Sequence, residues 1–436
     1  MDYKLREVWS LGPCTMKIFQ PKIISTLKNY SSKQLISDIV AGIIVAIIAL
    51  PLSIALAIAS GVEPEMGLYT AIVAGFVIAL LGGSKVNISG PTAAFAVIVA
   101  GIVAEHGIDG LAIATVLAGI ILILMGILKL GNLIKYIPNT ITTGFTSGIA
   151  VTIAIGQLKD FLQLTYPANT HNVETMDKAK NVLTNISGTS LIAVVVGIIG
   201  LAILIFWPYI SKKIPGSLIA VVVGVIIVKL LDLDVNTIGD LYPNITNAPP
   251  KFSMPGFSMD KVIQLIPNAF TIAILAAIES LLSCVVSDEM ISDKHNSNTE
   301  LIAQGTGNIC SAFFGGIPAT GAIARTAANV KNGGRSPISG MVHAVVLFLI
   351  LILFMPYAKW IPMPIIAAIL FMVAYNMSEW RHFVKICKNA PLDDIIVLCI
   401  TFLFTVIFDL VVAIAVGMVL YILFLLIRRI KVNIKK

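Results

Sequence analysis

Charged side chains are scarce in this chain. Asp, Glu, Lys and Arg together supply 12% of its residues, about half of the roughly 25% found in soluble domains. That shortage excludes an ordinary soluble protein, and hydrophobic residues supply 57% instead. Long apolar runs, such as those that begin at Ser190 and Asp393, reach the roughly 20 residues that a helix needs to cross hydrocarbon. Several spans are required, so the sequence predicts a polytopic membrane protein.

Metal-binding and catalytic patterns are missing as well. The five cysteines are scattered and the five histidines form no ligand pattern, which predicts no metal site and no cofactor. No HExxH motif, aspartate pair or Ser–His pair lies on an apolar segment, so we predict that the protein is not an enzyme. The flanks of membrane spans explain the formal charge of +7. We therefore predict no nucleic-acid partner.

Apolar runs between Pro, Gly and charged residues divide the chain into about fourteen segments, each long enough to span a membrane or half of it. They are found near Leu35, near Gly67, after Ser89, at Leu111–Leu128, Ile137–Leu158, Ser190–Ile210, Pro215–Leu231, Ile266–Val286, Leu301–Phe314, after Gly321, and at Gly340–Pro356, Ile361–Met377, Asp394–Phe408 and Leu410–Ile427. This pattern leaves little room for a soluble domain.

The distribution of Lys and Arg indicates the topology. The residues up to Lys33 are basic and show no signal peptide, so we expect the N-terminus in the cytoplasm. With that end inside, 22 of the 30 Lys and Arg residues fall on the cytoplasmic side and 7 fall outside. The asymmetry predicts an even number of spans in the cell (inner) membrane, with both termini cytoplasmic.

Two segments are short and interrupted by Gly and Pro: NISGPTAAFAVIVAG, from Asn87, and GGIPATGAIARTAANV, from Gly315. They are the third of the first seven segments and the third of the last seven. Matching breaks of this kind are typical of transporters whose site lies between inverted repeats. We therefore predict an all-α polytopic fold with a 7+7 inverted repeat and two half-helices, each preceded by a short extended segment.

If each half-helix starts near the middle of the membrane, two helix N-termini face one small space. Their unpaired N–H groups and partial positive charge suit an anion. The alternative is that Gly and Pro only kink two helices. The predicted substrate-binding residues are Gly90, Pro91, Thr92, Ala93, Ala94, Thr320, Gly321, Ala322, Ile323 and Arg325.

Two charged residues stand inside apolar segments. Arg325 follows the second break, and Glu279 lies within TIAILAAIESLLSCVV, with Ser283 one turn later on the same helix face. Charge at this depth is costly, so Arg325 is a candidate for anion binding, and Glu279 with Ser283 for coupling. A static Arg325–Glu279 ion pair is the alternative. By contrast, Glu65 and the acidic residues of SDEMISDKHNSNTE lie in connections, where we expect them to be solvated.

The first broken segment carries a family resemblance. DIVAGIIVAIIALPLSIALAIASGVEPEMGLYTAIVAGFVIALLGGSKVNISGPTAA, from Asp38, resembles the N-terminal signature of the SulP (sulfate permease) anion transporters of the bacterial type. Leu50–Pro51, Gly67–Tyr69 and Gly90–Ala93 fall in the family order. GGIPATGAIARTAANVKNGGRSPISGMVHA, from Gly315, resembles the family's second broken segment, so the likeness covers nearly the whole chain.

The resemblance implies a uracil-permease-like fold in which a core domain moves against a gate domain, carrying a small anion by an elevator motion. It assigns residues 35–130 and 262–356 to the core, 131–261 and 357–428 to the gate, and 1–34 and 429–436 to cytoplasmic ends. It also implies a homodimer, and it puts Arg325 in the family's basic position. Family members usually continue into a cytoplasmic STAS domain, which we expect to be absent here.

The predicted function is secondary active transport of sulfate, bicarbonate or a dicarboxylate, by symport with protons. Sodium-coupled bicarbonate members are similar, but they have Asp at the position of Glu279 and a hydroxyl residue near Ile323, which favours protons here. Three alternatives stay open: an uncoupled anion exchanger or channel, a sodium-coupled bicarbonate symporter, and a nucleobase–cation symporter of the same fold.

Overall fold

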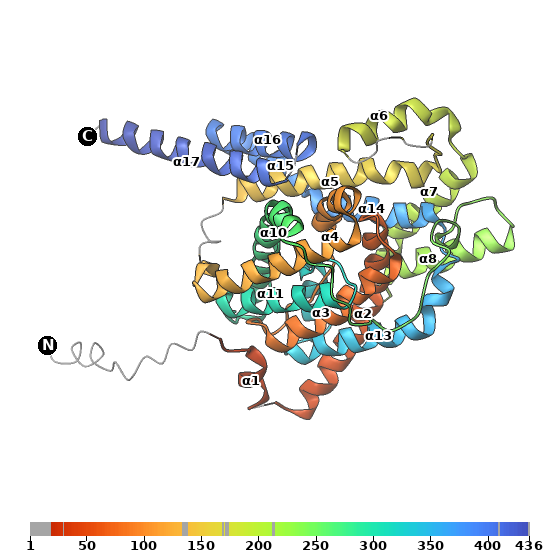
Figure 1. Cartoon of the computed structure of the whole chain (residues 1–436), viewed down its shortest axis with the longest axis horizontal. Helices are drawn as coiled ribbons and strands as arrows, with labels where there is room; N and C mark the ends of the chain where they lie inside the picture. Colours follow the sequence, from red (N-terminus) through yellow and green to blue (C-terminus); the bar gives the residue numbers. More distant parts are fainter. Residues whose placement is uncertain are drawn as a thin grey trace.

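The computed structural model describes residues 19–28, 30–132, 138–167, 170, 174–211, 214–408 and 410–434. The expectations for most of the N-terminal segment, for the basic residues Lys135, Lys212 and Lys213, and for the last two residues lie outside this described part. Figure 1 shows an arrangement made almost wholly of helices.

The described part of the first half of the chain has four short helices besides its spans. Its elements are α1 (Lys22–Leu27), α2 (Ser32–Ala59), α3 (Pro64–Leu81), β1 (Ser89–Gly90), α4 (Ala93–Ile127), α5 (Asn139–Leu162), α6 (Thr175–Asn185), the 3-10 helix η2 (Ile186–Gly188), α7 (Leu191–Ile210), α8 (Gly216–Leu230) and α9 (Ile238–Leu241). The second half repeats the strand between its second and third spans. Its elements are α10 (Met259–Ile291), α11 (Ser297–Phe313), β2 (Thr320–Gly321), α12 (Ile323–Lys331), α13 (Pro337–Ala358), α14 (Met363–Ser378), α15 (Trp380–Asn389), α16 (Leu392–Ile407) and α17 (Leu410–Ile434).

The predicted segments correspond to these helices. α4 holds the third and fourth segments, because the backbone at Gly107 (φ 69°, ψ −175°) breaks it into two helical pieces. The others are α2, α3, α5, α7, α8, α10, α11, α12, α13, α14, α16 and α17. By length and composition, eight stretches in the described part suit a membrane crossing, and Gly216–Leu230 and Val412–Ile427 are shorter apolar helices. The prediction of an all-α polytopic membrane protein is confirmed.

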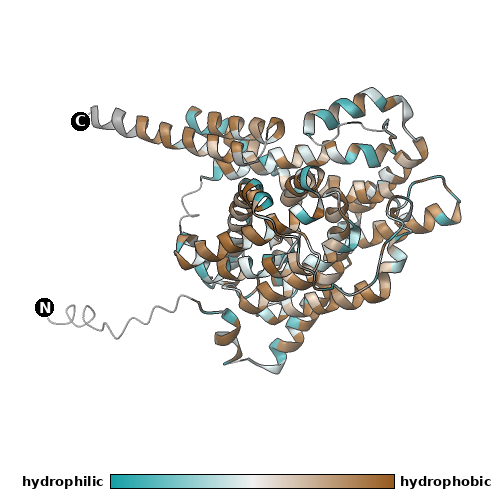
Figure 2. Ribbon diagram, viewed as in Figure 1, coloured by the Kyte–Doolittle hydropathy of each residue, from teal (hydrophilic) through white to brown (hydrophobic). Residues whose placement is uncertain are grey.

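Large apolar side chains cover the outside of the molecule. On α7, Leu191, Ile198 and Phe206 are all exposed, and Figure 2 shows hydrophobic residues along most helices, with hydrophilic ones mainly near helix ends and connections. Apolar surface this extensive is not stable in water. It fits a surface that faces lipid.

Helices of one half of the chain pack against helices of the other half, in the matching pairs that an inverted repeat requires. α2 and α3 both pack against α13, and correspondingly α10 and α11 both pack against α4. α5 packs against its counterpart α14, while α16 packs on α5 and α7 packs on α14. In Figure 1, α4 and α11 run side by side at the centre of the molecule.

The approach of α4 to α11 depends on two small residues. A Cβ added to Gly119 would lie 2.6 Å from the carbonyl oxygen of Gly305, and a Cβ on Gly305 would in turn meet the carbonyl oxygen of Gly119. Because neither residue has a side chain, the two backbones pack directly on one another. Close packing through small residues is how membrane helices associate without a hydrophobic driving force.

Two groups of helices follow from these contacts. The central group consists of α2, α3, α4, α10, α11, α12 and α13 with both strands, and the flanking group consists of α5, α7, α8, α14, α16 and α17. Contacts between the groups run from α2 to α5, α8 and α14, and from α4 to α5. In the flanking group, α16 and α17 lie side by side at one end of the molecule (Figure 1).

The two strands meet in the middle of the central group. They pair antiparallel, with Ser89 opposite Gly321 and Gly90 opposite Thr320. The extended segments predicted before the half-helices are therefore confirmed. Their pairing satisfies backbone groups that would otherwise be exposed at membrane depth.

Candidate functional site

The strand pair brings two helix N-termini together, because α4 follows β1 and α12 follows β2. The N–H of Ala322 extends the pairing by donating to the carbonyl of Ile88 (2.8 Å). The N-cap residues are Thr92 for α4 and Ala322 for α12, and neither side chain caps its helix. The first-turn N–H groups of both helices are thus left to other acceptors, and such groups bind anions.

Arg325, on the first turn of α12, reaches across to the turn between β1 and α4. Its side chain is only 2% exposed, and its Nη2 donates to the carbonyl oxygen of Pro91. Within the described part of the chain, its Nε and Nη1 have no hydrogen-bond partner. Buried donors normally have partners, so two donor nitrogens without partners on a buried cation mark a place for an anion.

Glycine is required where Arg325 passes the strands. A Cβ added to Gly90 would lie 2.7 Å from Nη1 of Arg325, and one added to Gly321 would lie 2.8 Å from Nδ2 of Asn87. Neighbouring side chains therefore approach the backbone closely at both glycines. Because Gly90 has no side chain, the guanidinium can lie directly against the β1 backbone, and Gly321 leaves room for the amide of Asn87.

Glu279, on α10, lies at the N-terminus of α4. Its Oε2 accepts a hydrogen bond from Oγ1 of Thr92 (2.8 Å), so the carboxylate occupies the end of the helix where negative charge is stabilised. Both Glu279 and Arg325 are described, and the ion pairs within 4.0 Å do not include one between them. The structure thus gives no support to a static, closely bonded pair.

The remaining half-helix residues fall into buried and exposed sets. Thr320 is buried, and its Oγ1 donates to the carbonyl oxygen of Ala276 on α10 (2.9 Å). Ala93 and Ala94 are buried in the first turn of α4, whereas Ile323 on α12 is 42% exposed. The accessible side of the half-helix pair is therefore the side that Ile323 faces.

Ser283 bonds to different residues from Glu279, although the two lie one helical turn apart on α10. Its Oγ lies 2.7 Å from Oδ1 of Asn87 and 3.1 Å from Oγ1 of Thr326. It joins a buried polar network behind the strands rather than bonding to the carboxylate of Glu279. The coupling role of Ser283 stays a prediction.

Two acidic residues that we expected to be solvated are buried. Glu300 is 0% exposed and Glu65 is 5% exposed, so the expectation was wrong for both. Each lies in the first turn of a helix, α11 for Glu300 and α3 for Glu65, where the adjoining connection folds back into the bundle. The polarity of the local sequence gave no sign of this, because three of the donors to Glu300, on Gly83, Ser84 and Asn87, lie more than 200 positions away.

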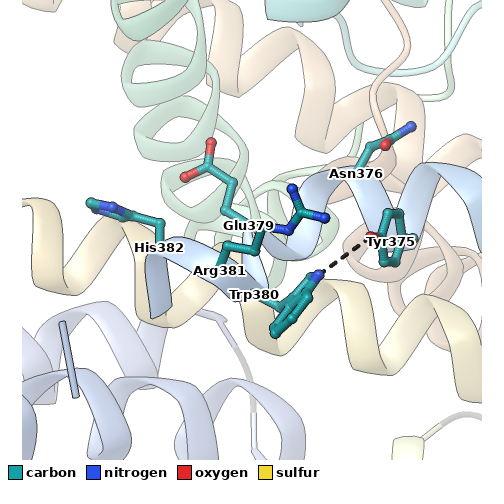
Figure 3. A pocket seen from close by; sticks show the side chains of 6 residues that line it. All are labelled: Tyr375, Asn376, Glu379, Trp380, Arg381 and His382. Carbon is teal, nitrogen blue, oxygen red and sulfur yellow. Dashed lines mark hydrogen bonds between the residues drawn. The ribbon is translucent and has the colours of Figure 1, made fainter. Parts of the chain in front are cut away.

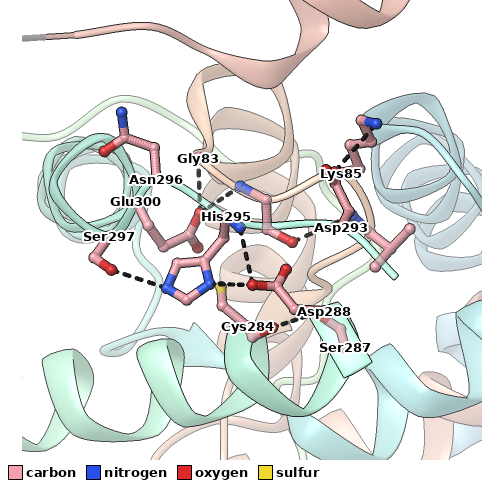
Figure 4. A network of polar contacts seen from close by, with 12 residues as sticks. Gly83, Lys85, Cys284, Ser287, Asp288, Asp293, His295, Asn296, Ser297 and Glu300 are labelled. Carbon is pink, nitrogen blue, oxygen red and sulfur yellow. Dashed lines mark hydrogen bonds and ion pairs between the residues drawn. The ribbon is translucent and has the colours of Figure 1, made fainter. Parts of the chain in front are cut away.

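The connection between α10 and α11 carries a second polar cluster (Figure 4). His295 Nδ1 lies 2.7 Å from Oδ2 of Asp288, and Asp293 Oδ2 lies 3.1 Å from Nζ of Lys85 and 3.3 Å from Nζ of Lys22. Burial acts to raise the pKa of Asp293, but the neighbouring backbone N–H and the two ammonium groups outweigh it, so this pKa lies below its usual value.

A surface hollow of about 320 Å³ lies at the junction of α14 and α15 (Figure 3). It is lined by Tyr375, Asn376, Glu379, Trp380, Arg381 and His382. None of the predicted site residues lines it, and α15 packs against α5 and α16. We assign it no part in the half-helix site.

Fold and site together define a class of protein: a membrane transporter in which two broken helices meet between inverted repeats. A sequence model described as the Sulfate permease family matches residues 35–401. The chain belongs to the sulfate permease family of anion transporters.

Individual relatives agree with this membership. The chain is 42% identical over 402 residues to the "Putative sulfate transporter YvdB" of Bacillus subtilis, covering 91% of this chain and 74% of that protein. It is 34% identical over 394 residues to the bicarbonate transporter BicA of Picosynechococcus, covering 87% of this chain and 68% of BicA.

Solved structures are similar throughout the helical region. The transmembrane domain of a cyanobacterial bicarbonate transporter BicA matches with a TM-score of 0.79 and 30% identity, over 88% of this chain and 98% of that chain. Murine Solute Carrier 26 family member A9, in its inward-facing state, matches with a TM-score of 0.81 and 19% identity, over 97% of this chain and 74% of that chain. The second likeness concerns the fold alone.

Proposed function

We propose that this protein is a secondary active transporter of a small inorganic or carboxylate anion, such as sulfate, bicarbonate or a dicarboxylate, and that it works by proton symport. The observation that carries the proposal is the carboxylate of Glu279 at the N-terminus of α4, hydrogen-bonded to Thr92. Arg325 lies beside the same turn, and two of its nitrogens, Nε and Nη1, have no hydrogen-bond partner among the described residues. A negative side chain thus occupies a position that suits an anionic substrate.

Glu279 and the anion would compete for the N-terminus of α4, and this competition would couple anion binding to proton binding. While Glu279 is ionised, its charge partly neutralises the positive end of α4 and repels an incoming anion. A proton on Glu279 removes that charge, and the anion then binds the free N–H groups of α4 and α12 and of Arg325. Release of the proton on the other side restores the carboxylate and expels the anion. One proton would accompany each anion in this scheme.

The elevator motion is proposed on the same basis. The core domain would comprise residues 35–130 and 262–356, and the gate domain residues 131–261 and 357–428. The contacts support this division, since the helices separate into a central and a flanking group with few connections between them. Both half-helices lie in the central group, so the whole anion site would move as one body.

Several properties are proposed with this function. The protein would lie in the cell (inner) membrane with both termini in the cytoplasm, as the Lys and Arg distribution predicts. It would form a homodimer and act as a transporter without enzymatic activity. Its partners would be the anion, protons and the lipid bilayer.

Sodium-coupled bicarbonate symport is a second candidate. The similarity to BicA proteins, described as bicarbonate transporters, favours bicarbonate as the anion. Glu279 is a carboxylate that a sodium ion, rather than a proton, would neutralise in the same competition. The two candidates differ in the cation alone, so one experiment separates them.

The test is uptake of labelled sulfate, bicarbonate and fumarate into proteoliposomes under an inward proton gradient without sodium, and under an inward sodium gradient at constant pH. We expect accumulation with the proton gradient and its loss in Glu279→Gln, whose side chain is permanently neutral. Glu105→Gln is the matched control, since the Glu105 side chain is 70% exposed. Accumulation with sodium alone would favour the second candidate. Uptake indifferent to both gradients and to Glu279→Gln would overturn coupling and leave an exchanger or channel.

A further inference from the structure

Glu300 forms an unusual concentration of hydrogen bonds for a side chain inside a membrane bundle. Its Oε2 accepts from the backbone N–H of Gly83 (2.9 Å) and of Ser84 (3.3 Å), both on the connection between α3 and β1. Figure 4 shows the carboxylate directed at Gly83. These two bonds fix the start of the segment that leads into the first strand.

The other carboxylate oxygen, Oε1, bonds to three side chains from three different parts of the fold. Oε1 of Glu300 accepts from Nδ2 of Asn87 (2.8 Å), from Oγ of Ser280 on α10 (3.2 Å) and from Nε2 of Gln304 on α11 (3.0 Å). Gln304 Nε2 also donates to Oγ of Ser89 in β1 (3.0 Å). Glu300 is the acceptor in all five of these hydrogen bonds, so each of these neighbours presents a donor to it.

The orientation of Asn87 follows from this requirement. Its amide N faces Glu300, and its Oδ1 is therefore presented to the hydroxyls of Ser283 (2.7 Å) and Thr326 (3.1 Å). Thr326 in turn accepts a hydrogen bond from the backbone N–H of Ile88 (2.9 Å). A continuous chain of hydrogen bonds thus runs from Glu300 through Asn87 to Thr326.

Thr326 is the residue after Arg325 on α12, and Ile88 immediately precedes β1. The chain of hydrogen bonds therefore ties the helix that carries the cation to the strand that leads into the other half-helix. We propose that Glu300 is a positioning residue of the anion site: through Asn87 and Thr326 it sets where Arg325 lies relative to the N-terminus of α4. This inference rests on the proposed anion transport.

The main test is Glu300→Gln, which keeps the shape of the side chain. The Gln amide oxygen can still accept from Gly83 and Ser84, but its N–H₂ then faces the N–H₂ of Asn87, and Asn87 must turn away. We expect the KM for labelled sulfate or bicarbonate, whichever the wild-type protein accumulates, to rise about tenfold, with a smaller change in kcat. Glu65→Gln, another buried acid of the central group, is the matched control and should leave KM unchanged.

A second substitution that restores the hydrogen bond between positions 300 and 87 distinguishes a positioning role of Glu300 from a general structural role. In Glu300→Gln with Asn87→Asp, the Gln N–H₂ donates to the new carboxylate, whose other oxygen again accepts from Thr326. We expect this double variant to recover most of the wild-type KM. Thr326→Val, which removes the hydroxyl at the far end of the chain, should raise KM in the same way and decides the matter if Glu300→Gln does not fold.

The results separate this inference from the proposed function. A folded wild-type protein that takes up none of the anions would overturn the function itself. If the wild type transports, but Glu300→Gln and Thr326→Val melt at lower temperature with wild-type KM, Glu300 only stabilises the fold and the inference is wrong.

Discussion

The central and flanking groups of helices bury different kinds of side chain. In the described residues of the central group, the buried side chains with a carboxyl, guanidinium or imidazole group are Asp38, Glu65, Glu300, Arg325 and His343. In those of the flanking helices, the buried polar side chains are the neutral Thr143, Ser147, Thr152, Gln157, Thr401 and Thr405. Burying charge costs several kcal/mol, so the concentration of these side chains in the central group indicates where the chemistry takes place.

The two groups of helices also differ in how far apart in the sequence their hydrogen-bonded residues lie. In the flanking group, Thr152 and Thr405 donate to carbonyls one turn back on their own helices. In the central group, Glu279 and Glu300 bond to residues about 190 and 215 positions away in sequence. Polar bonds between distant segments therefore gather around the broken helices, but they are not confined to that region: Oγ of Ser147 on α5 donates to the carbonyl of Ser378 at the end of α14 (2.6 Å).

The largest expected effect comes from crowding the cation of the central group. Gly90→Ala would put a Cβ 2.7 Å from Nη1 of Arg325, whereas the Cβ of Gly101→Ala, on α4, would meet nothing within 4 Å. Overpacking of this kind costs about 1–3 kcal/mol, which corresponds to roughly a tenfold to hundredfold loss. We expect anion uptake in proteoliposomes to fall by that amount in Gly90→Ala and to stay near wild type in Gly101→Ala. Equal uptake by both variants would show that Arg325 has room to move.

The second effect, on the stability of the fold, compares the same Thr→Val substitution in the two groups. Thr70 and Thr401 are both fully buried, but Oγ1 of Thr70 accepts from the N–H of Ile317 (2.7 Å), while that of Thr401 has no partner within the described residues. Thr70→Val leaves a buried N–H unsatisfied and should lower the free energy of unfolding by about 1–3 kcal/mol. Thr401→Val should change it by less than about 0.5 kcal/mol. Denaturant unfolding in detergent measures both, and a larger loss in Thr401→Val would contradict the comparison.

The same division explains what the sequence could predict. Spans depend on apolar runs of a fixed length, so the helices of both groups could be located from composition alone. The half-helices could be located because Pro91 and Gly321 interrupt such runs. These signals are local, and they lie within a few residues of the feature that they predict.

The polar network of the central group could not be predicted in this way. Glu300 follows a stretch of charged and polar residues typical of a solvated loop, and its donors at Gly83 and Asn87 come from the other half of the chain. Ser283 shares a helix face with Glu279, yet it bonds to Asn87 and Thr326. Which of several possible polar partners a buried side chain takes depends on how the two halves interlock.

The smallest expected effect lies at the margin of the central group, where Asp293 bonds to Lys22 and Lys85. Because the pKa of Asp293 is lowered in the folded protein, its contribution to stability is present above the ordinary pKa of an aspartate and is lost as pH falls through the lowered value. Partly exposed ion pairs contribute less than about 1 kcal/mol. We therefore expect Asp293→Asn to lower the melting temperature slightly at neutral pH.

The pH dependence distinguishes this ion pair from a general loss of charge. Melting of wild type and Asp293→Asn in detergent should differ at pH 7 and converge as the pH is lowered, because the wild-type carboxyl then becomes neutral as well. Glu289→Gln removes a nearby exposed carboxylate and should match wild type at every pH. A constant difference between wild type and Asp293→Asn across the whole range would mean that the hydrogen bonds of this side chain, and not its charge, hold Lys22 and Lys85 in place.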